Sequence, residues 1–128
     1  ATGDTPTFAG CLRNAAAVAR SAALVGTRIA VIPAGERWED GTLRPSLEDL
    51  LGAGAILNAL SGSQSMEAEA AVAAFLHFRD RLPETLANCG SGKELIERSF
   101  SFTEDIRLAA ELNASTSAPR LVNGAFVG

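Results

Sequence analysis

The stretch Arg28-Ile-Ala-Val-Ile-Pro33 decides the fold that the sequence predicts. It is short, rich in β-branched residues and followed by proline and glycine, which is typical of a β-strand. Because its apolar residues are continuous rather than alternating, we expect a strand that is covered on both faces. Strands of this kind belong to sheets that are flanked by helices. The predicted fold class is therefore α/β, a helix-rich three-layer α/β/α arrangement with a largely buried sheet.

Amphipathic periodicity predicts helices on both sides of this strand. The expected helices cover residues 8–24, 47–60, 66–82, 92–98 and 102–113. Residues 34–45 are predicted to form a loop, and residues 119–126 a last strand or an extended tail. Gly52 and Gly54 weaken the second helix, so we expect them to allow close approach to a neighbouring element.

Polar residues predict where these helices begin and end. Thr5 or Thr7 can cap the first helix, and Gly26 is expected to stop it. Three capping-box patterns open later helices: they are Ser46–Asp49, Ser91–Glu94 and Ser101–Glu104. Pro83 is expected to end the third helix or to start a new turn.

Length and composition exclude several classes of protein. The 128 residues point to a single domain, residues 1–128, and the net charge of −4 disfavours a nucleic-acid surface. No apolar stretch approaches the roughly 20 residues of a membrane helix. The first residues lack the pattern of a signal peptide. We expect a cytoplasmic protein that binds neither nucleic acid nor membrane, and a homo-oligomer is compatible with these features.

The strongest group of chemical residues follows the predicted strand, in Pro33–Trp38 and Arg44–Asp49. Carboxylates are the ligands that Mg²⁺ prefers, commonly one or two of them with water and a substrate phosphate. Arginine offers a planar fork that matches phosphate or sulfonate oxygens. Together these residues can hold an anionic substrate around a metal. The alternative is a solvated loop, in which Glu48 and Asp49 only complement the helix dipole.

Other residues carry weaker signals. Asn14 is disfavoured inside a helix, so it either faces a ligand or forms a structural hydrogen bond. His77 is best interpreted as a packed or surface histidine. Cys11 and Cys89 are best interpreted as small core residues, while a disulfide, or a nucleophilic pair with His77, stays open. Gly90-Ser-Gly92 fits a cap better than a phosphate-binding loop.

The chain resembles the 2-phosphosulfolactate phosphatase family along nearly its whole length. The most specific segments are Cys11–Ala19, Ile29–Trp38 and Asp40–Ile56, and shorter similar ones are Cys89–Ile96, Asp105–Leu112 and Asn123–Phe126. The resemblance implies an α/β phosphatase that depends on Mg²⁺. Its implied substrate is 2-phospho-3-sulfolactate, which is hydrolysed to 3-sulfolactate and phosphate on the route to coenzyme M.

With this resemblance, the candidate residues take roles. Glu36 and Asp49 are the expected catalytic residues and, with Glu48, the expected magnesium ligands. Asn14, Arg37 and Arg44 are expected to bind the substrate. Metal-bound water is the default nucleophile, and a carboxylate is its competitor.

The chain looks like the C-terminal portion of the family pattern. Segments of the types Asp-Val-Leu-Arg-Ala-Thr-Thr-Thr and Thr-Asn-Gly have no counterpart in it. One alternative is therefore a fragment that needs an N-terminal half for activity. In that case an apolar face made by Leu50, Leu51, Ile56 and Leu57 would await other strands. Another alternative is a non-catalytic module that binds a small anionic metabolite.

Overall fold

The computed structural model describes residues 5–128. In this range the elements follow in the order η1 (Leu12–Asn14), α1 (Ala15–Val25), β1 (Glu36–Arg37), β2 (Leu43–Arg44), α2 (Leu47–Asn58), α3 (Met66–Phe78), η2 (Arg79–Arg81), α4 (Leu82–Asn88), α5 (Gly90–Arg98), α6 (Phe102–Ala109), β3 (Arg120–Val122) and β4 (Ala125–Val127). None of these helices is long and apolar enough to cross a membrane.

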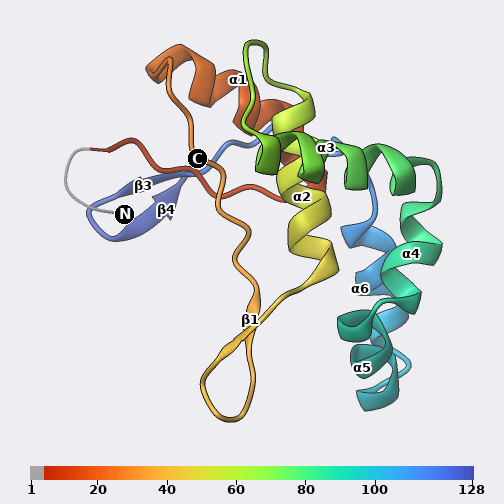
Figure 1. Cartoon of the computed structure of the whole chain (residues 1–128). Helices are drawn as coiled ribbons and strands as arrows, with labels where there is room; N and C mark the ends of the chain where they lie inside the picture. Colours follow the sequence, from red (N-terminus) through yellow and green to blue (C-terminus); the bar gives the residue numbers. More distant parts are fainter. Residues whose placement is uncertain (1–4) are drawn as a thin grey trace.

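The molecule consists of packed helices from which two β-hairpins project (Figure 1). Helix α2 is central and contacts both α1 and α3, while α4, α5 and α6 pack together beside it. Within residues 5–128 the strands form the antiparallel hairpins β1–β2 and β3–β4, and β3 makes one further bridge, from Arg120 to Phe8. The described residues are therefore helix-rich with two small sheets, and the expected three layers around a buried sheet are not formed among them.

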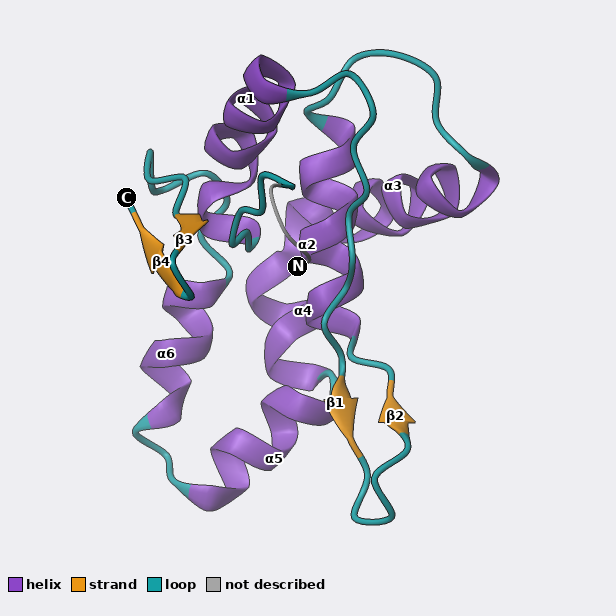
Figure 2. Ribbon diagram, turned by 90° about the vertical axis from the view of Figure 1, so that its left-hand side faces the viewer, coloured by secondary structure: helices purple, strands orange, loops and turns teal. Residues whose placement is uncertain are grey.

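The predicted strand at residues 28–33 is wrong for the described chain. These residues run as an extended segment from α1 past α2 to β1, with no strand beside them (Figure 2). Val31 packs partly against the core, whereas Ile32 is 85% exposed. A strand needs a neighbour for its backbone N–H and C=O groups. No described segment lies beside these residues as a partner strand. Their β propensity therefore produces an extended backbone but no sheet.

The core lies between α2 and the helices around it. Leu51 and Leu82 are its most deeply buried large side chains. The other buried members are Leu12, Ala15, Val18, Ala19, Ala55, Ile56, Phe75, Leu86, Ile106 and Ala110. The face of α2 that includes Leu51 and Ile56 is thus buried by helices of the same chain. Leu50 of the same helix is 37% exposed, and its packing against further strands stays a prediction.

Gly54 is where α2 and α3 come closest. A β-carbon on Gly54 would collide with the carbonyl oxygen of Ala71 and lie 2.7 Å from the β-carbon of Phe75. A β-carbon on Gly52 would instead have its nearest neighbours at 3.9 Å. The predicted close approach is therefore confirmed for Gly54, and Gly52 has room to spare.

The first helix begins later than the periodicity predicts. Phe8 forms an antiparallel bridge with Arg120, Ala9 N–H donates to the carbonyl of Pro119, and Leu121 N–H donates to the carbonyl of Thr7. The segment that is expected to form the first helical turn therefore pairs with the β3–β4 hairpin instead. Neither Thr5 nor Thr7 caps a helix. Gly26 follows the last residue of α1, as predicted.

Other boundaries shift for local reasons. The predicted helix 66–82 ends at Phe78, and Pro83 lies in the first turn of a new helix, α4. Helix α5 begins at Gly90, so Gly90-Ser-Gly92 and the predicted capping residue Ser91 lie inside it. Helix α6 ends at Ala109 rather than 113. Residues 119–126 provide the β3–β4 hairpin.

None of the three predicted capping boxes forms a side-chain cap within residues 5–128. Ser46 precedes α2 but makes no capping hydrogen bond, and its hydroxyl is buried without a partner. Ser101 precedes α6, where it likewise makes no side-chain cap. Ser65 is a cap that sequence reasoning missed, since its hydroxyl accepts from Ala68 N–H at the start of α3. A polar residue before a helix therefore marks the boundary better than it predicts the hydrogen bond.

An ion-pair network joins η1 to α6 and to the residues that follow α6. Arg13 donates to the carboxylate of Glu111 at 2.6 Å and to the carbonyl of Leu108 at 2.7 Å. Arg107 bonds both Glu104 and Glu111. The hydrogen bond from Arg13 lowers the pKa of Glu111 below its ordinary value, and Arg107 acts in the same direction.

Acid is expected to weaken the native state through this network. A carboxyl whose pKa is lowered by folding stabilises the protein above its unfolded pKa of about 4.3, and that stability is lost as pH falls through the folded pKa. The melting temperature of the wild type should therefore fall more between pH 7 and pH 3 than that of Glu111→Gln. Thermal denaturation by circular dichroism measures this. Equal losses in both proteins would show that Glu111 contributes nothing.

Candidate functional site

The site is built on the β1–β2 hairpin, which begins at a glycine. Gly35 has φ +67°, and its N–H donates to Oδ2 of Asp49 at 2.7 Å. A β-carbon there would lie 2.9 Å from Cδ1 of Leu43 and 3.2 Å from the carbonyl oxygen of Arg44. Both the left-handed backbone and the lack of space require glycine. Asp49 thus joins the first turn of α2 to the base of the hairpin.

The hairpin tip is held by local hydrogen bonds. Trp38 N–H donates to the carbonyl of Thr42, and Gly41 N–H to that of Trp38. The carboxylate of Asp40 accepts from both the N–H and the hydroxyl of Thr42, and the hydroxyl is the larger cause of the lowered pKa of Asp40. The side chains of β1 and β2 are therefore presented from a defined turn.

Arg44 connects this hairpin to α5. Its guanidinium donates to both carboxylate oxygens of Glu94, at 3.0 and 2.7 Å, and lies 3.3 Å from the carboxylate of Glu36. One face of the guanidinium covers the ring of Trp38, 4.8 Å from its centroid. The hydrogen bonds with Glu94 raise the pKa of Arg44 and lower that of Glu94. Both side chains are charged at neutral pH.

A pocket of about 360 Å³ opens between the hairpin and α5. It is lined by Glu36, Arg37, Arg44, Glu48, Ser91, Glu94, Leu95 and Arg98. Seven of these eight residues are polar or charged, and they include three arginines and three glutamates. Such a surface fits a small charged molecule better than an apolar one.

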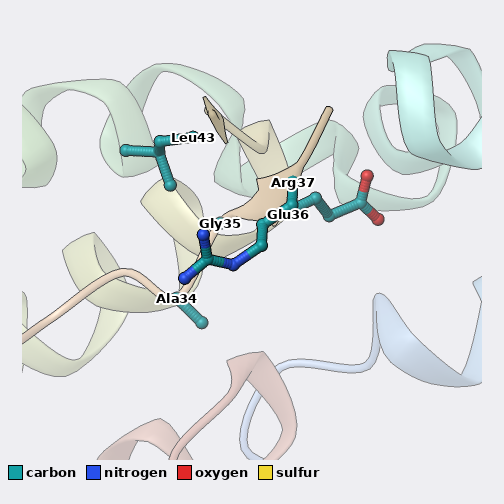
Figure 3. A pocket seen from close by; sticks show the side chains of 5 residues that line it. All are labelled: Ala34, Gly35, Glu36, Arg37 and Leu43. Carbon is teal, nitrogen blue, oxygen red and sulfur yellow. The ribbon is translucent and has the colours of Figure 1, made fainter. Parts of the chain in front are cut away.

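A second hollow, of about 400 Å³, lies along β1. Figure 3 shows its lining: Ala34, Gly35, Glu36, Arg37 and Leu43. Glu36 and Arg37 point in opposite directions, as neighbouring residues of a strand do. The guanidinium of Arg37 bonds the carbonyl of Gly41 at 2.8 Å and has no ion pair within residues 5–128.

Sequence reasoning missed the contribution of α5. Ser91, Glu94, Leu95 and Arg98 recur at helical spacing and place one face of α5 against the pocket. That spacing is visible in the sequence. What it does not show is which helix faces the hairpin, because this contact joins residues about 50 positions apart.

The predicted site residues separate into two groups. Glu36, Arg37, Arg44 and Glu48 come together around the pocket. Asp49 does not line it, because its carboxylate is taken by Gly35. Asp49 therefore has a structural role at the hairpin base through one carboxylate oxygen, and its predicted catalytic role stays a prediction.

Asn14 lies away from the pocket and is committed to backbone groups. Its oxygen accepts from Cys11 N–H at 2.8 Å, and its amide donates to the carbonyls of Ala9 and Ser117 at 3.2 and 3.1 Å. Both amide protons are used, and the residue is buried. The expected donation to a ligand would break one of these bonds, so we drop Asn14 from the substrate site.

The residues expected to hold magnesium do not gather. Within residues 5–128 no three Asp, Glu, His or Cys side chains are placed to bind one metal ion. Asp49 is turned to Gly35, Glu36 faces Arg44, and Glu48 lies 3.8 Å from Sγ of Cys89. As a trio, Glu36, Glu48 and Asp49 therefore do not fit the ion.

The remaining nucleophilic groups are separate. His77 contacts Arg81 at 3.0 Å, so no Cys–His pair forms among the described residues. Cys89 is half-buried, and burial with the nearby carboxylate of Glu48 raises its pKa. Cys11 is exposed, which corrects its assignment to the core, and neither cysteine is in a disulfide.

The comparison with protein families gives one finding. The model of a family described as 2-phosphosulpholactate phosphatase matches residues 1–124. No curated protein and no solved structure matches the chain significantly. The match extends over the β1–β2 hairpin, all the described helices and β3, and it ends before β4, so it includes the pocket.

Proposed function

The chain belongs to the 2-phosphosulpholactate phosphatase family, and from this we propose that it hydrolyses 2-phospho-3-sulfolactate, or a similar small anionic phosphomonoester, in the pocket between the β1–β2 hairpin and α5. The family is one of phosphatases. The finer assignment of substrate and pocket is our proposal.

The observation that carries the proposal is the convergence of three arginines. Arg37, Arg44 and Arg98 come from β1, β2 and α5 and line one pocket. The proposed substrate bears a phosphate, a sulfonate and a carboxylate. A guanidinium fork matches the oxygens of each of these groups. The charge of these arginines suits a substrate with three anionic groups, while the guanidinium of Arg37 points away from Glu36 and bonds Gly41, and that of Arg44 bonds Glu94.

Arg98 is the pocket arginine best placed to bind substrate directly. It is exposed at the last turn of α5 and has no ion pair in the described part of the chain. Arg37 likewise keeps donors free beyond its bond to Gly41. We assign these two arginines to the anionic groups of the substrate.

The pocket carboxylates are the candidates for proton transfer. Hydrolysis breaks the bond between phosphorus and the substrate's bridging oxygen, while a water oxygen forms the new bond. Glu36 or Glu48 would take the proton from water or give one to the departing oxygen. Water is the proposed nucleophile, since the raised pKa keeps Cys89 as a thiol at neutral pH.

Magnesium dependence is proposed from the family alone. A bound Mg²⁺ would neutralise phosphate oxygens, commonly with only one or two protein carboxylates and several waters. Glu36 and Glu48, which do line the pocket, are the residues left to hold it. No role of the residues above depends on the ion.

Phosphate release from 2-phospho-3-sulfolactate tests the proposal, with magnesium and again with a chelator. Circular dichroism of the same sample establishes that it is folded. Turnover would support the function, and loss of turnover with the chelator would support the metal. A folded protein that releases no phosphate would overturn the catalytic proposal.

Arg98→Ala is expected to lower kcat/KM about 10- to 100-fold. Hydrogen bonds to a charged group contribute about 1.5–3 kcal/mol, which corresponds to that range. Arg20→Ala is the matched control, because Arg20 is an exposed arginine on α1. Steady-state kinetics of phosphate release measures both variants. Equal kcat/KM values for Arg98→Ala and the control would exclude Arg98 from the site.

A non-catalytic role has one observation in its favour. The described residues hold no gathered set of metal ligands, and the three glutamates offset the charge of the three arginines. Such a pocket can bind a small anion without converting it. Calorimetry with 3-sulfolactate distinguishes the two: binding by a protein that shows no turnover favours the binding module.

A further inference from the structure

We propose that Glu94 occupies the oxyanion-binding edge of Arg44 in the free protein, and that a small oxyanion replaces it there. The inference rests on the proposed function only for the location of the site. In this view Glu94 is a positioning and specificity residue, because its carboxylate fills the anion site of the pocket when no ligand is bound.

The geometry of the pair is that of a bound ligand. The two oxygens of Glu94 accept two parallel hydrogen bonds from the two terminal nitrogens of Arg44, at 3.0 and 2.7 Å. Arginine binds carboxylate and phosphate ligands with the same fork. The carboxylate of Glu94 therefore marks the place where two oxygens of an external anion would sit.

The rest of the guanidinium is already covered. Trp38 lies over one face, and the carboxylate of Glu36 lies 3.3 Å from Nη1. On the side of Nη2, a β-carbon at Gly90 would lie 3.4 Å from that nitrogen, so α5 leaves little more than the space of a side chain there. The edge held by Glu94 is thus the one through which an anion in the pocket can reach Arg44.

Glu94 is able to leave that edge. Its side chain is 46% exposed, whereas that of Arg44 is 17% exposed. Released, the carboxylate passes into water, where hydration replaces its hydrogen bonds to Arg44. Arg44 stays in place, because Trp38 and Glu36 hold it from the hairpin side.

The charges around Glu94 favour a charged competitor. Arg44 on β2 and Arg98 on its own helix lower its pKa, while Glu36 and Glu48 are the carboxylates that face the same arginine from β1 and α2. At neutral pH Glu94 is therefore an anion that competes with any ligand. An incoming group must offer two coplanar acceptor oxygens and a negative charge to replace it.

Binding of inorganic phosphate, followed by calorimetry, tests the inference without any turnover. Glu94→Gln keeps the length of the side chain and removes its charge, so phosphate should bind about three- to fivefold more tightly, the range that loss of an exposed ion pair allows. Glu97→Gln is the matched control, since Glu97 is an exposed glutamate of the same helix with no ion pair within residues 5–128. It should leave the affinity nearly unchanged.

A third variant shows whether the gain in phosphate affinity depends on Arg44. Arg44→Gln combined with Glu94→Gln should lose the tightening. A double variant that still binds phosphate more tightly than the wild type would overturn the inference, and so would Glu94→Gln that binds no more tightly than Glu97→Gln. A merely structural Glu94 would lower the melting temperature without tightening phosphate binding. Failure of the proposed function is a separate result, namely no release of phosphate from the phosphomonoester.

Discussion

Gly54→Ala is expected to destabilise the protein by about 2–3 kcal/mol, the range of an overpacked core. The added β-carbon would meet the backbone carbonyl of Ala71 and the β-carbon of Phe75, neither of which lies at the end of a flexible side chain. Helices α2 and α3 would have to move apart. Since Leu51 and Phe75 pack in the same core cluster, that movement would loosen the core as well.

Gly52→Ala is the matched control, and the sign of its effect is opposite. The β-carbon there finds its nearest neighbours at 3.9 Å, which is ordinary contact. Alanine is also favoured over glycine inside a helix by up to about 1 kcal/mol. Urea denaturation followed by circular dichroism compares the two. Similar stabilities for both variants would show that α2 and α3 are not as close as described.

Asn14→Ala should cost about 2–4 kcal/mol, because it leaves three partly buried backbone groups without partners. The side chain bonds Cys11, Ala9 and Ser117, so its loss affects an N–H and two carbonyl groups. Asn14→Asp should be no better, since a carboxylate would face two carbonyl oxygens. The midpoint of urea denaturation measures both variants.

Asn88→Ala provides the comparison. Asn88 is exposed and donates only to the carbonyl of Glu84, so its replacement should change stability by less than about 0.5 kcal/mol. An Asn14→Ala protein that keeps wild-type stability but loses phosphate binding would restore Asn14 to the substrate site. The structural role requires the reverse.

The sequence predicts the helices well and the strands poorly, for a physical reason. Helical hydrogen bonds are local, so periodicity alone indicates α2 and α3 to within a few residues. A strand depends on a neighbour, and residues 28–33 have the right composition without one. Phe8 is the opposite case, because its sequence pattern predicts a helix but it pairs with Arg120 instead. Local sequence patterns cannot predict that pairing, since the two residues lie far apart in the chain.

The candidate site was predictable in part. The density of arginines and carboxylates in Pro33–Trp38 and Arg44–Asp49 predicts a site there, and four of these residues, Glu36, Arg37, Arg44 and Glu48, line the pocket; their function stays a prediction. The other side comes from α5, and Glu94 and Arg98 could not be assigned because their partner lies far away in the chain. Asp49 and Asn14 look like site residues in sequence, yet each is used by the backbone of a neighbouring turn. In a sequence, a polar residue that forms hydrogen bonds with buried backbone groups cannot be distinguished from a polar residue that binds a ligand.

The attachment of the N-terminal segment to the β3–β4 hairpin has a kinetic consequence. Asn14 and Ser117 are separated by 103 positions, and the bonds from Ala9 to Pro119 and from Leu121 to Thr7 close loops of similar length. Closing a loop of this size lowers the conformational entropy of the chain before any stabilising contact has formed. The helical contacts near α2 and α3 can form early, whereas the two ends of the chain must meet late. We therefore expect this final closure to limit the rate of refolding, which should be slower than that of a helical bundle whose contacts are all local.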